Sequence, residues 1–419
     1  MSRLTFSDQS LPQDDRDIRE SLQAQGLEPA YSFMIRVRMP AGVCTPKQWL
    51  QMDEIADEHG NSTFKLTTRQ TFQFHGIIKK HLKPAMQAIN KALLDTIAAC
   101  GDVSKYSTVS PRIPLMADRN VQCTVNPAMS KTHATVYEFS KNLSEHLLPR
   151  TSAYHEIWLD QKKVAGGEVG DLEPLYGPTY LPRKFKMAVA VPPDNGVDIF
   201  TNDVGWIAIV ENDQVVGYNV TVGGGMGVTH SNKKTYPRLA DVIGFVTPED
   251  ALKAAECIML TQRDNGNRQD RKNARLKYTV DRMTLAGFKA DVERRMGKPF
   301  QPARPFEFTH NTDTYGWQQG HDGKWHFTMF IENGRVEDSP RNQFKTGLRE
   351  IASVHKGEFR LTANQHLILS NVAPEDKPEM ERLMAKWGLD NISQTGLRLS
   401  SSACVAFPTC GLAMAESER

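Results

Sequence analysis

The sequence contains two copies of one pattern, and this repeat limits the fold more than any other feature. The stretch 348–371, "LREIASVHKGEFRLTANQHLILSN", matches 50–76, "LQMDEIADEHGNSTFKLTTRQTFQFHG". In both, a helical pattern leads through a short turn into alternating apolar and polar residues, which is typical of a half-buried strand. A separation near 295 residues (Phe64 to Phe359) excludes a solenoid array. The repeat therefore indicates two copies of an α/β unit, which could face each other across a pseudo-twofold axis.

The two copies differ in charge although they agree in pattern. Close counterparts in the two copies are Phe64, Lys65, Leu66, Thr67 and Gln70 in the first and Phe359, Arg360, Leu361, Thr362 and Gln365 in the second. Arg69, however, is replaced by Asn364, and His75 is replaced by Ser370. The first copy has therefore kept a cationic face that the second copy has not.

The stretch 64–76 alternates throughout, and we expect it to form one strand with an apolar face and a cationic face. The apolar side chains are Phe64, Leu66, Phe72 and Phe74. The opposite side chains are Lys65, Thr67, Arg69, Thr71, Gln73 and His75, with no acid among them. Arginine forks bind carboxylates through two hydrogen bonds, and lysine adds a movable positive charge. This face is therefore typical of a site for a large anion.

Further cations lie elsewhere in the chain at strand-like spacing. They are Arg36 and Arg38 in "IRVRMP", Arg119 in "DRNVQC", Lys184 and Lys186 in "PRKFK", and several more in "NRQDRKNARLKYT". Taken singly, each stretch is more simply a solvated face. Together with 64–76 they favour a concave anionic-ligand site. The glycine-rich stretch 221–230 lacks both the lysine of a phosphate-binding loop and the dinucleotide-binding spacing.

Composition and termini exclude several classes of function. A net charge of +2 over 419 residues is too balanced to favour nucleic acid or a membrane surface as the partner. No apolar run reaches the length of a membrane span, and the N-terminal residues lack the apolar core of a signal peptide. We therefore expect a cytoplasmic protein.

The cysteines leave two interpretations open. Six cysteines in a chain of this length do not make a disulfide framework. Cys404 and Cys410 stand six apart, a spacing that fits neither zinc knuckles nor redox pairs. An iron–sulfur cluster needs about four thiolates, so a cluster site and two buried thiols are equally compatible with the spacing. We expect the remaining cysteines to lie in the core: Cys44, Cys100, Cys123 and Cys257.

Four long motifs, in order, carry a resemblance to a known family. They are "TTRQTFQFHGI", "LPRKFK", "TQRDNGNRQDRKNARLKYT" and "ACVAFPTCGLAMAE". From about residue 13 to residue 419 the chain resembles the hemoprotein subunits of assimilatory NADPH-dependent sulfite reductases, which belong to the siroheme and [4Fe–4S] nitrite and sulfite reductases. The resemblance implies six-electron reduction of sulfite to sulfide, in sulfate assimilation and cysteine biosynthesis. It also implies electrons from an NADPH-dependent flavoprotein partner.

The resemblance also assigns residues to ligands. The siroheme carboxylates would be held by Lys65, Thr67, Arg69, Gln73 and His75, and sulfite by Arg36, Arg119, Lys184 and Lys186. Cys404 and Cys410 would ligate the [4Fe–4S] cluster. This assignment is physically consistent, because sulfite is a small dianion whose oxygens must leave as water. Fixed cations stabilise its charge, and lysines can relay protons.

Two departures from the family stand out. The family has a second pair of cluster cysteines, which would lie beyond Arg419, so the resemblance implies a C-terminally truncated chain with half the cluster ligands. In addition, residues Ser104 to Ala117 intervene just before Arg119, where family members run almost directly onward. This insertion could displace Arg119.

The expected fold class is α+β, with two related α/β half-units around a siroheme site. We expect an extension over 1–29, a ferredoxin-like repeat domain from 30–112 and 315–389, a siroheme- and substrate-binding domain over 113–314, and the start of a [4Fe–4S] domain over 390–419. The alternatives are a siroheme nitrite reductase, a ferredoxin-dependent sulfite reductase, and a non-catalytic remnant that keeps the fold.

Overall fold

The computed structural model describes residues 2–4, 20–21, 24–26, 32–97, 99, 121–123, 126–150, 157–159, 162–165, 173–407, 409–410 and 413–418. The chain divides into two units. Unit 1 comprises Met1–Thr96 and Asp313–Arg419, and unit 2 comprises Ile97–Thr312. Helices and strands mix in both units, which confirms the α+β fold class. The domain boundaries expected from the sequence stay a prediction.

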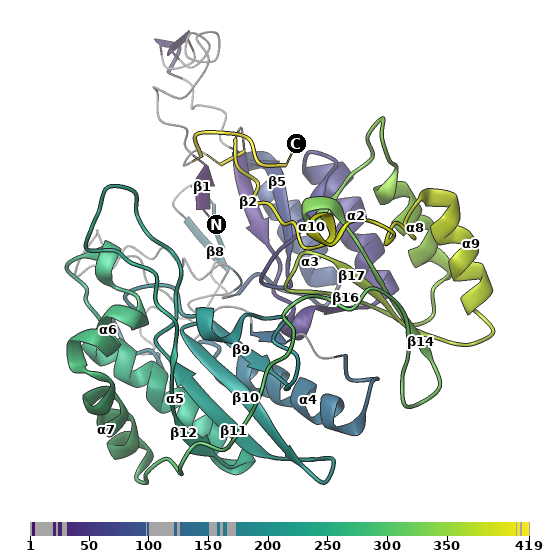
Figure 1. The fold of residues 1–419 in the computed structure, drawn as a ribbon. Coiled ribbons are helices and arrows are strands. Elements are labelled where there is room, and N and C mark those ends of the chain that lie inside the picture. The colour runs from purple at the N-terminus through teal and green to yellow at the C-terminus, as the bar shows by residue number, and fades with distance from the viewer. Residues whose placement is uncertain are drawn as a thin grey trace. The chain divides into compact units, whose positions relative to one another are not determined.

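Unit 1 contains two five-stranded antiparallel sheets built to the same plan (Figure 1). The first sheet consists, in spatial order, of β1 (Ser2–Leu4), β2 (Ser32–Arg36), β5 (Phe72–Ile78), β4 (Phe64–Leu66) and β15 (Arg335–Val336). The second consists of β13 (Gly316–Gln319), β14 (Trp325–Met329), β17 (Leu367–Val372), β16 (Glu358–Leu361) and β3 (Val43–Cys44).

Each half of unit 1 contributes one edge strand to the sheet of the other half. Strand β15 comes from the second half but pairs with β4 of the first, where Val336 lies opposite Phe64. Strand β3 comes from the first half but pairs with β16 of the second, where Cys44 lies opposite Phe359. Such reciprocal pairing is what a pseudo-twofold relation produces. The repeat predicted from the sequence is therefore confirmed.

The prediction of one strand over 64–76 is wrong, because the chain turns back in its middle. Strands β4 and β5 form an antiparallel hairpin in which Lys65 lies opposite Gln73. The amide of Gln70 donates to the carbonyl of Thr67 at 2.9 Å, and Gln70 has a φ of +53°, which reverses the chain. The alternation survives, because directly opposed residues point to the same face of a sheet.

The turn of each hairpin carries a glutamine whose side chain donates a hydrogen bond to the main chain of the other half. The Gln70 side-chain amide donates to the Leu361 carbonyl at 2.9 Å, and the Gln365 amide donates to the Leu66 carbonyl at 3.4 Å. Gln365 has a left-handed φ of +71°, as Gln70 does. The two turns therefore follow the same pseudo-twofold relation as the exchanged strands.

Helices cover the apolar faces of the two sheets and form one core with them. These helices are α2 (Pro46–His59), α3 (Leu82–Lys91), α8 (Phe344–Val354) and α9 (Lys377–Trp387); the shorter elements are η1 (Pro40–Gly42), η2 (Lys79–His81), η6 (Glu332–Gly334) and α10 (Gly396–Leu399). Helix α2 begins at a capping box formed by Thr45 and Gln48. Its Trp49 is fully buried, and the ring contacts Phe64 and Phe72 of one half and Phe359 of the other.

Unit 2 has one mixed five-stranded sheet in the order β12-β11-β10-β9-β6. Its strands are β6 (Gln122–Cys123), β9 (Met187–Ala190), β10 (Val204–Glu211), β11 (Gln214–Val222) and β12 (Asp241–Val246). Its helices are α4 (Lys131–His146), α5 (Pro248–Asn265), α6 (Leu276–Met283) and α7 (Leu285–Met296), with η4 (Ile199–Thr201) and η5 (Arg271–Asn273). Strands β7 (Ile157–Leu159) and β8 (Lys162–Ala165) pair separately.

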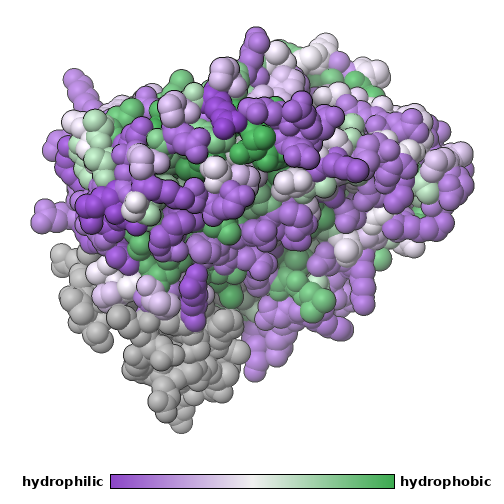
Figure 2. Space-filling model, turned by 90° about the horizontal axis from the view of Figure 1, so that it is seen from below, coloured by the Kyte–Doolittle hydropathy of each residue, from purple (hydrophilic) through white to green (hydrophobic). Residues whose placement is uncertain are grey.

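Hydrophilic side chains cover most of the face drawn in Figure 2, and apolar groups lie between them in small patches. Among the residues that the structure describes, no helix is both long enough and apolar enough to cross a membrane.

The exchange of strands predicts an unequal cost for two glycine substitutions. A Cβ at Gly42 would lie 2.6 Å from the Leu361 carbonyl oxygen, on backbone that cannot yield cheaply, and φ is +73°. Gly388 has a similar φ of +66° but has no atom within 4 Å of an added Cβ. We expect Gly388→Ala to lower the free energy of unfolding by about 1 kcal/mol and Gly42→Ala by at least about 3 kcal/mol. Urea unfolding of both variants measures this, and equal costs would contradict the close approach of the halves.

Candidate functional site

A row of polar side chains crosses four neighbouring strands of the first sheet in unit 1. Arg36 on β2 lies opposite Gln73 on β5, Gln73 lies opposite Lys65 on β4, and Lys65 lies opposite Arg335 on β15. Directly opposed residues share a face, so these side chains stand side by side on the face away from the aromatic core. Lys65 is only 3% exposed and Gln73 only 7%. The row is thus a buried cationic surface, a costly arrangement without an anionic partner.

Hydrogen bonds along the row fix the protonation state and tautomer of His75. The guanidinium of Arg36 donates to Gln73 Oε1 at 2.5 Å, which orients the Gln73 amide so that its nitrogen donates to His75 Nε2 at 2.7 Å. An accepting Nε2 requires a neutral imidazole with its proton on Nδ1. That Nδ1 is buried, and within the described part of the chain it has no hydrogen-bond partner. The row therefore presents a buried N–H donor with no acceptor.

Burial and neighbouring charge agree with this neutral state. Burial, and then the positive charges of Arg335, Lys65 and Arg36, lower the pKa of His75 to about 3. Burial also lowers the pKa of Lys65, and this effect outweighs the opposite effect of the Glu418 carboxylate.

One carboxylate already lies on the row. Glu418 forms an ion pair with Lys65 and a second one with Arg335, whose Nη2 is 2.8 Å from Glu418 Oε2. The Lys65 ammonium also donates to the Ala403 carbonyl at 2.8 Å. The row is thus shaped to hold carboxylate oxygens, here supplied by the segment that follows α10.

Thr67 and Arg69 lie in the turn of the hairpin rather than in the row. The hydroxyls of Thr67 and Thr71 are 2.6 Å apart, and Thr67 Oγ1 accepts from the Arg69 amide at 3.2 Å. Arg69 is 5% exposed. The structure thus brings together four of the predicted residues, Lys65, Gln73, His75 and Arg36, and places Thr67 and Arg69 beside them at the end of the hairpin.

In the second copy, acids of the same half pair with the residues at the corresponding positions. Asp313 accepts from the Thr362 hydroxyl at 2.6 Å and from the Asn364 amide at 2.9 Å. Arg360 forms an ion pair with Glu358 at 2.6 Å. The counterparts of Thr67, Arg69 and Lys65 are therefore paired with acids of their own half, which the first copy does not offer at these positions.

Lys184 and Lys186 belong to unit 2 and precede β9. Both are half-buried, and Phe185 between them is 1% exposed, so the two lysines share the side opposite the core. The Lys186 amide donates to the Asp203 carboxylate at 2.9 Å. Arg119 and the insertion Ser104 to Ala117 lie outside the residues that the structure describes, and their roles stay predictions.

Cys404 is exposed and Cys410 is half-buried. Within the described ranges, no group of three or more His, Cys, Asp or Glu side chains is arranged to hold a metal ion. Two thiols fall short of the four that a [4Fe–4S] cluster requires. Cys44, Cys123 and Cys257 are buried, as predicted, and Cys100 lies outside the described residues.

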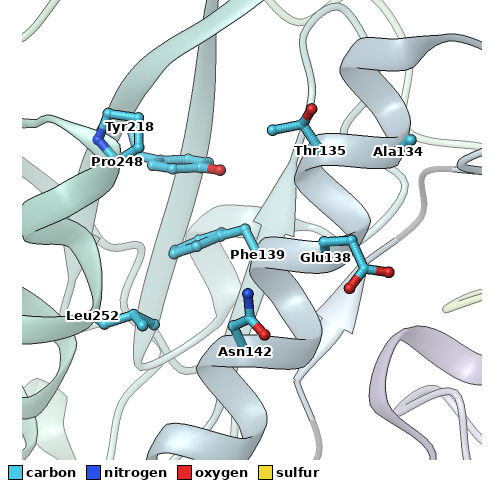
Figure 3. Close-up of a pocket in the computed structure, with 8 residues that line it drawn as sticks. All are labelled: Ala134, Thr135, Glu138, Phe139, Asn142, Tyr218, Pro248 and Leu252. Carbon is cyan, nitrogen blue, oxygen red and sulfur yellow. The ribbon is translucent and has the colours of Figure 1, made fainter.

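A cavity of about 510 Å³ lies in unit 2 between α4, β11 and the start of α5 (Figure 3). Tyr218 stacks on Phe139 at 4.1 Å beside it, and burial raises the pKa of Tyr218. The lining contains an acid, Glu138, and no cation. The cavity therefore lacks the chemistry of an anion site, and its location differs from that of every predicted site residue.

Sequence reasoning missed Arg335, because the partner strand comes from the other half of the chain. The signal was present in "ENGRV" (332–336), which corresponds to "PAGVC" (40–44) once the repeat is extended toward the N-terminus. Both segments form a short η turn, with left-handed Ala41 and Asn333, and then the exchanged strand.

The neutral state of His75 predicts a pH dependence. The unfolded chain binds a proton at His75 below about pH 6.5, whereas the folded chain does so only near pH 3. Stability from this residue is therefore complete above pH 6.5 and declines as the pH falls. We expect His75→Gln to reduce the slope of unfolding free energy against pH by up to about 1.4 kcal/mol per unit between neutral pH and about pH 4. Urea unfolding across this range measures it, with exposed His321→Gln as the control. An unchanged slope in His75→Gln would contradict the assignment.

Comparison with known proteins follows the same division of the chain. Residues 138–300 match the family described as "Nitrite and sulphite reductase 4Fe-4S domain", and residues 25–92 and 318–387 both match the "Nitrite/Sulfite reductase ferredoxin-like half domain". The sequence of 138–300 contains a single cysteine, Cys257, which is buried on α5. This segment therefore cannot by itself supply the four thiolates of the cluster named in that description.

Curated relatives cover nearly the whole chain. The sulfite reductase [NADPH] hemoprotein beta-component of Geobacillus thermodenitrificans is 58% identical over 410 residues, which span 97% of this chain and 69% of the relative. That of Bacillus subtilis is 55% identical over 419 residues, spanning 100% and 71%. The solved structure of Mycobacterium tuberculosis NirA protein, at 21% identity, has a TM-score of 0.70 over 92% of this chain and 62% of that one, which shows a shared fold. The chain therefore belongs to the nitrite and sulfite reductase family, among the sulfite reductase hemoprotein beta-components.

Proposed function

We propose that this chain is the siroheme-binding component of an assimilatory sulfite reductase, which reduces sulfite to sulfide with six electrons. The relatives are named sulfite reductase [NADPH] hemoprotein beta-components, which supports sulfite reduction as the activity. The observation that carries the proposal on the structural side is the row from Arg36 to Arg335, with buried cations and the buried Nδ1–H donor of His75. A cofactor rimmed with carboxylates is the ligand class that such donors suit.

The residues present fit siroheme. Lys65 and Arg335 already bind one carboxylate of the chain, and the His75 donor lacks an acceptor within the described residues. Lys65, Arg69 and Arg335 would neutralise the carboxylates of the rim, and Thr67, Gln73 and His75 would direct hydrogen bonds to them. When bound, siroheme supplies the redox chemistry at its iron, and the chain supplies place and charge.

The [4Fe–4S] cluster is implied by the family description. Cys404 and Cys410 would supply two of its thiolates. The described residues do not complete a four-thiolate site around them.

Sulfite would be bound by Arg36, Arg119, Lys184 and Lys186. Positive charge held in place by the fold stabilises the dianion and the charge that develops as each S–O bond breaks. The lysine ammonium groups can also donate the protons with which the oxygens leave as water.

A flavoprotein that takes electrons from NADPH is the proposed partner, because the relatives are named beta-components of an NADPH enzyme. The family description also includes nitrite reductases, so nitrite is the second candidate substrate. Comparison of turnover with sulfite and with nitrite separates the two. A cytoplasmic location is part of the same proposal.

Loss of one of the cations proposed to bind the siroheme carboxylates should weaken siroheme binding selectively. We expect Arg69→Ala, purified from cells that make siroheme, to retain several-fold less of it than the wild type, since a buried charge-assisted contact is lost. Arg183→Ala is the matched control, since Arg183 lies next to Lys184 outside the row. Heme absorbance per protein measures retention. Equal retention in both variants would remove the assignment of Arg69, and absence of siroheme from the wild type would favour a non-catalytic protein.

Lys184 should act on the substrate rather than on the fold. We expect Lys184→Met to keep the heme spectrum of the siroheme-loaded protein and to lose about 100-fold or more of its sulfite turnover with a chemical electron donor, the range typical of a lost proton donor. Normal turnover in this variant would show that Lys184 has no role in the reaction.

A further inference from the structure

We propose that Asp203 is a positioning residue for Lys186: its buried carboxylate fixes the main chain of Lys186 and thereby the origin of the substrate-binding ammonium. The inference rests on the proposed function, because it deepens the role of Lys186. It concerns unit 2 alone and uses contacts between residues of that unit.

The Lys186 peptide is held on both sides by the residues at the start of β10. The Lys186 amide donates to Asp203 Oδ2 at 2.9 Å, and its carbonyl accepts from the Val204 amide at 3.1 Å. Immediately afterwards Met187 comes into register with Val204 in the parallel pairing of β9 and β10. The position from which the Lys186 side chain starts is therefore set by Asp203 and Val204.

Asp203 is itself held by a two-pronged ion pair. Its side chain is fully buried, and Arg275 donates from Nε to Oδ1 at 2.9 Å and from Nη2 to Oδ2 at 2.7 Å. The side chain of Arg275 is 12% exposed. The guanidinium neutralises the carboxylate, so that Asp203 can accept from the Lys186 amide at a tolerable desolvation cost. Its negative charge is thus engaged by Arg275 near the lysine that would bind an anion.

The first turn of α6 also contacts the glycine-rich loop through Lys277. Lys277 is 2% exposed, and its ammonium donates to the carbonyls of Gly225 at 2.9 Å and Gly227 at 3.0 Å, and contacts that of Tyr236. Arg275 is the N-cap residue of α6, and Lys277 lies in its first turn. The start of α6 therefore contacts both Asp203, which binds the Lys186 amide, and the glycine-rich loop.

Positioning explains this arrangement better than stability does. Buried ion pairs contribute little net stability compared with apolar residues of the same volume, but they define geometry. A lysine side chain loses rotamer freedom when it binds a ligand, and a fixed main chain limits the additional freedom that must be lost. Asp203 thus acts through Lys186 and is not assigned any contact with the substrate.

The first test is amide hydrogen exchange of the full chain without added substrate. Asp203→Asn replaces the carboxylate by a neutral amide whose nitrogen faces a donor in either orientation: Arg275 Nε at the Oδ1 position, or the Lys186 N–H together with Arg275 Nη2 at the Oδ2 position. The remaining oxygen is a weaker acceptor than the carboxylate, so the contact with the Lys186 N–H is weakened or lost. We expect exchange at Lys186 to become at least about tenfold faster, the effect of losing about 1.4 kcal/mol of protection. Asp291→Asn on α7 is the matched control, because Asp291 also forms ion pairs with two arginines, Arg294 and Arg295.

The second test is a double-mutant cycle on kcat/KM for sulfite in the siroheme-loaded protein. We expect Asp203→Asn to lower kcat/KM about tenfold in the wild-type background and to have no further effect in a Lys186→Met background, because the two residues act as one unit. Asp291→Asn should change neither value. If Asp203→Asn does not fold, Arg275→Lys, which keeps the charge but loses the fork, should give intermediate exchange and kcat/KM.

The outcomes separate this inference from the proposed function. Unchanged exchange at Lys186, or an equal loss of kcat/KM in both backgrounds, would overturn the positioning role while leaving the reductase assignment intact. Absence of sulfite turnover in the siroheme-loaded wild type would overturn the proposed function itself, and the exchange result would then describe a structural contact only.

Discussion

The exchange of edge strands between the halves of unit 1 is the constraint on which the candidate site depends. Strands β3 and β15 leave their own half and complete the sheet of the other. The pairing of β3 with the other half requires glycine at position 42, because an added Cβ would meet the Leu361 carbonyl. The Gln70 side chain donates a hydrogen bond to the same carbonyl and so joins the two halves at this point. Because β15 carries Arg335 to the side of Lys65, this junction also assembles the cationic row. Neither half could form that row alone.

A symmetric scaffold carries an asymmetric charge distribution. The two hairpins share their register, their left-handed turn glutamine and their contacts across the pseudo-twofold. In the second half Asp313 binds Thr362 and Asn364, and Glu358 forms an ion pair with Arg360. In the first half the corresponding face presents donors, and the carboxylate on it comes from Glu418, far along the chain. Duplication therefore preserved the backbone, while a few acid and base substitutions left one face able to bind an anion.

The cationic row and the Lys186 segment use buried charge in different ways. The row keeps a neutral His75 among cations, because burial and three positive charges oppose its protonation. The Lys186 segment instead neutralises a buried acid with Arg275 and uses the remaining acceptor capacity of that acid to hold a peptide group. In the row, the His75 donor that lacks an acceptor within the described residues indicates a ligand site. Around Lys186, the hydrogen-bonded network of Asp203 and Arg275 indicates a fixed geometry.

The sequence by itself determined the repeat, the alternation of the 64–76 segment and the residue types of an anion site, because these follow from local periodicity and side-chain chemistry. It also carried motifs sufficient for the family. Only the tertiary structure decided that 64–76 is a hairpin, since a turn at Gln70 leaves the apolar and cationic sets on the same faces as a single strand would. It also decided the places of Arg335 and Asp203, whose contacts join segments 270 residues apart (335 − 65) and 17 residues apart (203 − 186). Pairing register and main-chain hydrogen bonds between such segments leave no local periodic signal. The extended repeat marks the segment of Arg335 but not its pairing with Lys65, and for Asp203 the folded chain alone reveals the contact.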